Sequence, residues 1–284
     1  HNDFVRYLPT AYIFKINLLL TNDICLFCRD MLEIKDISIN FGGIKAVDKA
    51  SMTIEEGQIT GLIGPNGAGK TTLFNVIAGN LKPTYGQVSL LGEDITALPD
   101  YELFHKGVLR TFQLAHEFSN MTVLENLMVV PGQQTGESIL NTWFKREQIK
   151  IEEEVIKEKA LEVIEFLNLN HLTYELAGNL SGGQKKLLEL GRTMMVDAKI
   201  VLLDEVGAGV NRTLLNDIAD TIIKLNKEKN YTFFMIEHDM SFLSKLCDKV
   251  IVMTEGSVLL EGSIEEVTQN EEVIEAYLGR GGTQ

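Results

Sequence analysis

The sequence predicts an α/β fold whose core is interrupted by a helical insert. Strand patterns alternate with helical patterns before residue 113 and after residue 199, whereas no convincing strand lies between about 114 and 178. In addition, the apolar segment 58–64 runs directly into a glycine-rich loop and then a helix. The chain has 284 residues, of which 45% are hydrophobic, enough for one large domain with a packed core.

The first half of the core is mostly β-structure. Its one clear helix covers 70–79, where Gly79 and the nearby Pro83 are typical stop signals. Strands are predicted at 32–39, 58–64, 87–92 and 108–113.

The helical insert contains two recognisable helices. The first covers 121–130, and Thr122 followed by Glu125 three residues later forms a capping box at its start. The second covers 151–169 and places Ile156, Ala160, Val163 and Leu167 on one face. After the insert we predict a strand at 199–205, a helix at 213–229 and a strand at 231–238.

Composition excludes several classes of protein. The net charge is −14, which argues against a nucleic-acid-binding protein because such proteins present a basic surface to phosphates. Three cysteines do not form a disulfide framework and favour a reducing compartment. No run approaches eighteen apolar residues, so no membrane-spanning helix is predicted; the nearest candidate, 11–20, contains Lys15 and Asn17.

Residues 1–30 are expected to form an extension outside the fold, non-native or disordered, because the strand pattern begins only after Met31. Cys25 and Cys28 have the spacing of metal ligands, but the second pair that a zinc site needs is missing.

The segment Gly64–Thr72, "GPNGAGKTT", predicts a phosphate-binding loop. Gly64, Gly69, Lys70 and Thr71 fit the pattern G-x-x-x-x-G-K-[ST], between a strand and a helix. Glycines let the backbone turn its N–H groups toward phosphate oxygens, the lysine neutralises charge on the β- and γ-phosphates, and the hydroxyl of Thr71 ligates Mg²⁺.

Two acidic residues end the apolar strand "IVLLDE". Downstream of a phosphate-binding loop, Asp204 is placed to hold the hydration shell of Mg²⁺ and Glu205 to polarise the attacking water. Three further candidates are ambiguous alone. His238 could sense the γ-phosphate or be a structural histidine. Gln113 could reach the metal or the water, or it could lie exposed at a strand end. Phe41 could stack on adenine or belong to the core.

A second glycine-rich helix start lies more than a hundred residues downstream, in "NLSGGQKKLLELGRTMM". Ser181, Gly182 and Gly183 precede or begin a helical pattern there. Free backbone N–H groups and the positive end of the helix dipole favour an anion at such a helix start. The chain therefore has two predicted phosphate-binding positions.

Together these motifs resemble the nucleotide-binding subunit of an ABC transporter, over Leu32 to about Gly279. The resemblance implies a P-loop NTPase core with a mixed β-sheet and an antiparallel β part, plus an α-helical subdomain. The implied divisions are 31–113 and 185–265 for the core, 114–184 for the helical subdomain that ends in the signature "LSGGQ", and 266–284 for a C-terminal helical tail.

The resemblance also assigns the site, with ATP and Mg²⁺ as cofactors. Glu205, His238 and Gln113 are implied to be catalytic, and Thr71, Gln113 and Asp204 to hold the metal. The implied nucleotide-binding residues are Phe41, Gly64, Pro65, Asn66, Gly67, Ala68, Gly69, Lys70, Thr71, Thr72, Ser181, Gly182, Gly183 and Gln184. Val206 stands where the family usually has proline, and Arg212 departs from the usual pattern after "AGVN".

In this family two ATPase chains, identical or different, pair head to tail, so that the signature serves the partner's ATP. Transmembrane permease subunits dock on the helical subdomain, here expected at about 114–130 with Glu117 exposed, and a solute-binding protein acts indirectly. The subunit is then cytoplasmic, peripheral on the inner face of the membrane, and needs no nucleic acid.

The motifs "FGGIKAV", "RTFQL" and "MTVLENLMV" are similar to those of branched-chain amino acid and urea or amide importers. The sequence leaves open an exporter ATPase of the lipopolysaccharide type and a soluble, non-transport ABC ATPase.

Overall fold

The computed structural model describes residues 29–111, 117–132, 134–135, 145–196 and 198–278. Its strands form two sheets. A four-stranded antiparallel sheet has the order β2-β1-β4-β5, and a six-stranded sheet has the order β10-β9-β3-β8-β7-β6. The first comprises β1 (Asp30–Phe41), β2 (Ile44–Glu55), β4 (Tyr85–Leu90) and β5 (Glu93–Asp94), and the second β3 (Ile59–Ile63), β6 (Val108–Arg110), β7 (Ile200–Asp204), β8 (Thr232–Ile236), β9 (Lys249–Thr254) and β10 (Ser257–Gly262).

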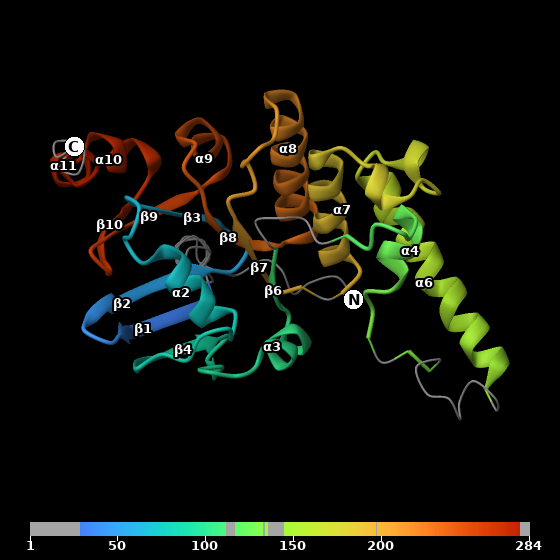
Figure 1. Ribbon diagram of the computed structural model, residues 1–284, viewed down its shortest axis with the longest axis horizontal. Helices are drawn as coiled ribbons and strands as arrows, with labels where there is room; N and C mark the ends of the chain where they lie inside the picture. Colours follow the sequence, from blue (N-terminus) through green and yellow to red (C-terminus); the bar gives the residue numbers. More distant parts are fainter. Residues whose placement is uncertain (1–28, 112–116, 133, 136–144, 197, 279–284) are drawn as a thin grey trace, which may run out of the picture.

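The helices lie around the six-stranded sheet and beyond one end of it (Figure 1). They are α2 (Lys70–Ile77), α3 (Asp100–Lys106), α4 (Val123–Met128), α6 (Arg146–Phe166), α7 (Gly182–Met194), α8 (Arg212–Lys229), α9 (Met240–Leu246), α10 (Ile264–Gln269) and α11 (Glu271–Leu278), with short 3₁₀ turns at Asn170–Leu172 and Ala177–Asn179. The predicted α/β fold, with mixed and antiparallel sheets and a helical insert, is confirmed.

The central strands β3, β7 and β8 are buried along their whole length. Strands β3, β7 and β8 pair in parallel, and parallel sheets are normally covered on both faces, which explains their unbroken apolar sequences. Alternate residues of β7 enter different cores. Val201 and Leu203 join the cluster under α7 and α8, whereas Leu202 joins the cluster formed with α2 and the antiparallel sheet.

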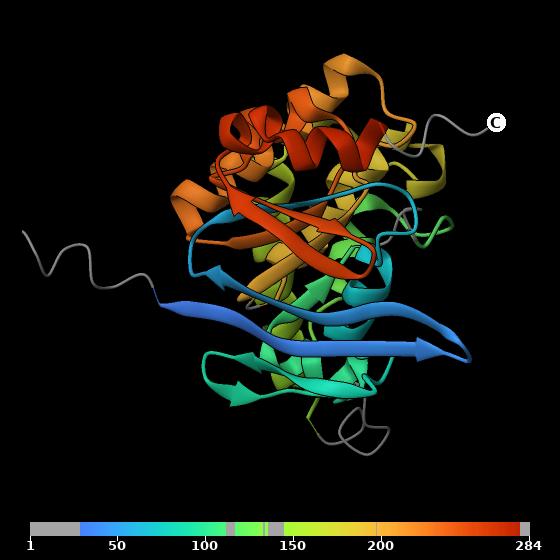
Figure 2. The ribbon, with the colours of Figure 1, turned by 90° about the vertical axis from the view of Figure 1, so that its left-hand side faces the viewer.

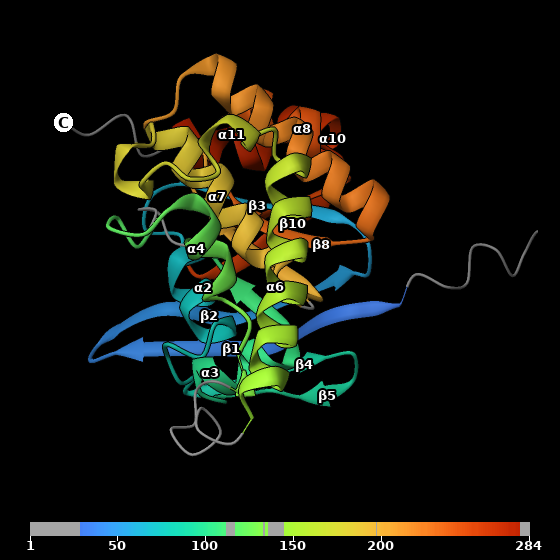
Figure 3. The same ribbon diagram turned by 90° about the vertical axis from the view of Figure 1, so that its right-hand side faces the viewer.

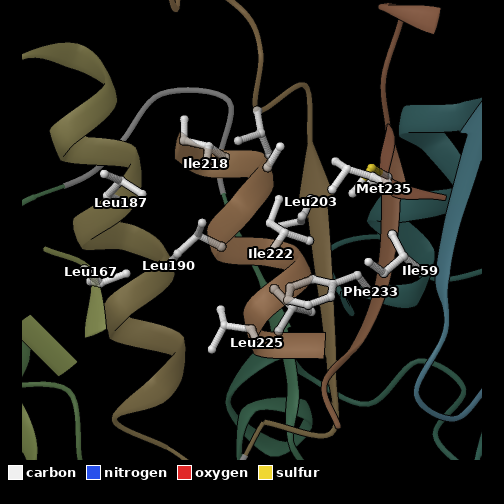
Figure 4. Packing of buried hydrophobic residues seen from close by; sticks show 14 of the residues in the cluster. Ile59, Leu167, Leu187, Leu190, Leu203, Ile218, Ile222, Leu225, Phe233 and Met235 are labelled. Atoms are coloured by element: carbon white, nitrogen blue, oxygen red, sulfur yellow. The ribbon is translucent and has the colours of Figure 1, made fainter. Parts of the chain in front are cut away.

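Helices α7 and α8 pack against each other and against the sheet. Figure 4 shows Leu187 and Leu190 of α7 beside Ile218, Ile222 and Leu225 of α8, with the labelled strand residues on the side of α8 away from α7. The N-terminal end of α7, which carries the signature, is therefore fixed to the core through α8.

The helical insert forms the end of the molecule opposite to α10 and α11 (Figure 1), and α6 runs along that end as one long helix (Figure 3). The predicted capping box of Thr122 and Glu125 is present at the start of α4. Ala160, Val163 and Leu167 are buried as the predicted face requires. Helix α6 begins at Arg146, earlier than the expected 151.

Two short helices were not predicted, and two local predictions were wrong. The sequence did not indicate α3 or α9, because a helix of seven residues has too few turns to show a clear period. Strand β8 ends at Ile236, so His238 lies in the following loop rather than in the strand. Glu117 is not exposed: its side chain is only 9% accessible, and a carboxylate oxygen lies 2.6 Å from Nζ of Lys185. Residues 1–28, which include Cys25 and Cys28, lie outside the described part.

Candidate functional site

The phosphate-binding loop connects β3 to α2 and is seated between β9 and β2. Gly64 has φ +147, and a Cβ there would lie 2.0 Å from the carbonyl oxygen of Met253. Gly69 has φ +96, and a Cβ there would lie 2.4 Å from the carbonyl oxygen of Ala46. Both positions therefore require glycine, for backbone conformation and for space. Figure 2 shows the antiparallel strands β1 and β2 passing in front of this part of the core.

Lys70 lies across the loop that precedes it. Its Nζ donates to the carbonyl oxygens of Gly64, at 2.6 Å, and Pro65, at 3.1 Å. Burial lowers the pKa of Lys70, while the carboxylates of Glu205 and Asp204 act to raise it. The ammonium is thus bound to the loop and lies within electrostatic reach of the two acids. The start of α2 has no side-chain cap, so the N–H groups of its first turn are left for a ligand, with exposed Thr71 beside them.

Asp204 ends β7 as a buried carboxylate, with its side chain 4% exposed. Oδ2 accepts a hydrogen bond of 2.7 Å from Arg110, whose other terminal nitrogen donates to Asn75 at 2.6 Å. Oδ1 is buried and has no hydrogen-bond partner. A buried carboxylate oxygen without a partner suits a hard, hydrated cation such as Mg²⁺, so Asp204 fits the metal role that its position in the sequence suggested.

Glu205 and His238 meet at the end of the sheet. Nε2 of His238 lies 3.1 Å from Oε1 of Glu205, and both side chains are partly exposed. The backbone of Glu205 is left-handed, with φ +50, and its N–H donates to the carbonyl of Ile236 at 2.9 Å. This pairing with β8 and the left-handed backbone place the carboxylate beside His238.

The signature region has a different helix start from that of α2. Ser181 caps α7: its hydroxyl accepts from the N–H of Gln184, whose side chain accepts from the N–H of Ser181. Gly182 and Gly183 keep N–H groups that have no partner within a helix. Space around them differs, because a Cβ at Gly182 would meet nothing within 4 Å, whereas at Gly183 it would lie 1.8 Å from Leu214. Strands β7 and β8 separate α2 from α7 (Figure 1).

Of two further predicted residues, Phe41 and Gln113, the structure describes only Phe41. Phe41 ends β1 and is 53% exposed, which is consistent with a stacking surface and not with the core alternative. Gln113 lies outside the described residues.

Three functional neighbours were missed by sequence reasoning: Arg110, which holds Asp204, and Lys186 and Glu237, which contact the loop after β7. A charged residue within the apolar segment "VLRTF" was an available signal for Arg110.

Among the described residues, no group of three or more His, Cys, Asp or Glu side chains forms an independent metal site. In the same part of the chain, no helix is both long and apolar enough to cross a bilayer.

The model of the ABC transporter family matches residues 47–208, more than half of the chain. The chain belongs to the ATP-binding proteins of ABC transporters. It is therefore a nucleotide-binding protein and an ATPase of the kind that drives transport. A second model, for the branched-chain amino acid ATP-binding cassette transporter, matches residues 257–283. The resemblance inferred from the motifs is confirmed.

Similar proteins point to the same subfamily. The chain is 41% identical to a probable branched-chain amino acid transport ATP-binding protein of Archaeoglobus fulgidus, over 88% of this chain and 95% of the relative. It is 39% identical to a high-affinity branched-chain amino acid transport ATP-binding protein of Pseudomonas aeruginosa, over 88% and 98%. Among solved structures, the ADP conformation of an ATP-binding cassette of an ABC transporter shares 41% identity with a TM-score of 0.76, over 88% and 99%.

Proposed function

We propose that this ABC ATPase powers an importer of branched-chain amino acids or related small polar solutes, through separate permease subunits. The relatives' names support the solute class, and neither name refers to lipopolysaccharide export or to a soluble process. The observation that supports hydrolysis is the pair of Glu205 and His238, 3.1 Å apart, with Lys70 close enough for its charge to interact with Glu205 and Asp204.

Each residue has a defined role in the proposed reaction. Lys70 and the N–H groups at the start of α2 bind the phosphates, while Phe41 stacks on the base. Thr71 and Asp204 would hold Mg²⁺, which when bound neutralises phosphate charge and orients the terminal phosphate. Glu205 accepts a proton from the attacking water, and His238 holds the Glu205 carboxylate in place.

Replacement of Glu205 by glutamine tests this assignment. Glu205→Gln keeps the shape of the side chain and removes the charge that activates water, so turnover should fall roughly 10²–10⁴-fold while ATP still binds. The matched control is Glu228→Gln, because Glu228 lies exposed at the far end of α8. Near-normal turnover in Glu205→Gln would exclude Glu205 as the base.

The second phosphate-binding position is assigned to a partner chain's nucleotide in a head-to-tail dimer, identical or different. The separation of α2 from α7 and the open space at Gly182 support this arrangement. Mixing Lys70→Ala chains with Ser181→Arg chains tests it, with Glu205→Gln in both. A mixed dimer then contains one intact site and should retain ATP better than either variant alone. If Lys70 and Ser181 served one nucleotide in the same chain, mixing would restore nothing.

Permease docking is assigned to a cavity of about 710 Å³ between α3, β6 and α7. Its lining combines aromatic and charged side chains, and Tyr101 at its edge is 62% exposed. Part of the expected docking segment, 114–116, lies outside the described residues. Tyr101→Ala should reduce solute uptake by the assembled transporter while the isolated subunit keeps its ATPase rate. Equal loss in the isolated subunit would indicate damage to the fold instead.

In this assignment the chain lies at the cytoplasmic face of the membrane, held there by its permease partners, and a solute-binding protein acts on the other side. No nucleic acid takes part.

Uptake of radiolabelled leucine by the chain reconstituted with its permeases tests the solute class, with an uncharged sugar as the control. If neither leucine nor the sugar is taken up, the amino-acid assignment is removed and the ATPase assignment stays intact.

A further inference from the structure

Lys186 is a buried lysine of α7 that the proposed reaction does not use. It is only 8% exposed, although it lies five residues after Ser181 in a helix whose start faces solvent. Its Nζ donates to the carbonyl oxygens of Glu205, at 3.3 Å, Val206, and Ala208, at 3.2 Å. An ammonium group has three N–H donors, and all of them have acceptors on this one loop.

The loop that receives Lys186 is a tight turn. The N–H of Ala208 donates to the carbonyl of Glu205 at 3.1 Å, and Glu205 itself has the left-handed φ of +50. Such a backbone is unfavourable for a residue with a side chain and persists only when surrounding contacts hold it. Two buried side chains supply such contacts: Lys186 donates to the carbonyls of the turn, and Glu237 accepts the N–H of Gly207 at 2.8 Å.

The backbone before Val206 differs from the one that a proline at this position favours. A residue before proline is driven toward extended backbone, whereas Glu205 here is left-handed. Val206 is itself buried, and its carbonyl is one of the three bound by Lys186.

We propose that Lys186 is a positioning residue for hydrolysis, which fixes the backbone of Glu205 so that its carboxylate meets His238 and the attacking water. The proposal rests on the proposed function, in which Glu205 is the base. Lys186 donates to the backbone carbonyl of Glu205, so it holds the part of the residue that sets the direction of the carboxylate. Without the ammonium, the three carbonyls of the turn lose the donor that they share, and the left-handed backbone loses one of the contacts that hold it.

The test is Lys186→Met, which keeps the length of the side chain and removes the donors. Misplacing a catalytic group by about 1 Å can cost on the order of 10²-fold, so kcat should fall roughly 10–100-fold. KM and the dissociation constant for ATP should stay within about threefold, because the substitution leaves in place the groups proposed to bind phosphate, before α2 and at the start of α7. The matched control is Lys185→Met, since Lys185 pairs with Glu117 and not with this loop; its kcat should change little.

Single-turnover hydrolysis in the Glu205→Gln background separates positioning from general damage. If Lys186 acts through Glu205, adding Lys186→Met there should cause almost no further loss. A further tenfold loss, a wild-type kcat in Lys186→Met, or a parallel loss of kcat and ATP affinity would each overturn the proposal. Should Lys186→Met fail to fold, Lys186→Gln is too short for all three carbonyls and is judged by the same measurements.

The same variants test the role of Glu205 as the base and the role of Lys186 separately. Normal turnover in Glu205→Gln alone would remove the base assignment, whatever Lys186 does. An inactive Glu205→Gln together with a fully active Lys186→Met would leave the proposed function standing and overturn only the role of Lys186.

Discussion

Two adjacent glycines at the start of α7 are expected to respond to the same substitution in opposite ways. A Cβ at Gly182 would meet nothing within 4 Å, whereas at Gly183 it would lie 1.8 Å from Cδ2 and 2.1 Å from Cγ of Leu214. Because Cγ is close as well as the terminal carbon, a rotation of the Leu214 tip cannot relieve the contact. Gly183→Ala must move Leu214 or separate α7 from α8.

The magnitudes follow from this geometry. Overpacking costs about 1–3 kcal/mol, and removing a glycine from a helix returns up to about 1 kcal/mol. Gly183→Ala should therefore lose about 1–2 kcal/mol, a fall in Tm of roughly 2–8 °C for a chain of this size. Gly182→Ala should keep its Tm or gain roughly 2–4 °C. In a Leu214→Ala background, Gly183→Ala should no longer destabilise the protein.

For ATP-dependent dimerisation, Gly182→Ala is expected to be the damaging substitution, although it leaves stability unchanged or improved. The methyl group of Gly182→Ala occupies the open space where the partner chain's phosphate is proposed to bind. ATP-dependent dimerisation, measured by analytical ultracentrifugation in the Glu205→Gln background, should weaken by roughly 10–100-fold, equivalent to about 1.4–2.8 kcal/mol. A Gly182→Ala protein that dimerises with ATP as well as its parent would refute the placement of the second phosphate site. A Gly183→Ala protein with unchanged Tm would refute the packing argument.

Three further predictions concern other parts of the site. Arg110→Met should lower the free energy of unfolding by about 3–5 kcal/mol in urea titrations, because Asp204 is left buried and unpaired, and adding Asp204→Asn should recover most of that loss. Phe41→Ala should weaken ATP binding by about 1–3 kcal/mol in calorimetry and leave kcat at saturating ATP unchanged; equal binding would exclude base stacking. Burial raises the pKa of the Cys247 thiol from 9.0 to about 12, so its contribution to stability is complete below pH 9 and is lost as pH rises toward 12. In a variant whose other cysteines are serine, iodoacetamide at pH 8.5 should then react with this half-buried thiol far more slowly than with a free thiol, and a rate typical of a free thiol would contradict the raised pKa.

The sequence by itself determined the features that depend on neighbouring residues. Gly64, Lys70 and Thr71 identify the phosphate-binding loop because anion binding needs glycines and a lysine at fixed spacing beside a helix start. Thr122 and Glu125 predicted the start of α4 because both partners of a capping box lie within one helical turn. The unbroken apolar run before Asp204 likewise predicted a strand, and the structure shows that this strand is buried along its whole length.

Only the tertiary structure decided what lies opposite these residues. Arg110 and Asp204 are 94 residues apart in the chain and become an ion pair because β6 and β7 are adjacent in the sheet. Lys185 and Lys186 are indistinguishable in the sequence, yet one pairs with Glu117 and the other is buried against the turn after β7, because adjacent helical side chains point about 100° apart. Periodicity and propensity describe the chain over a few residues, whereas burial, strain at a left-handed residue and the pairing of charges depend on which distant segments pack together.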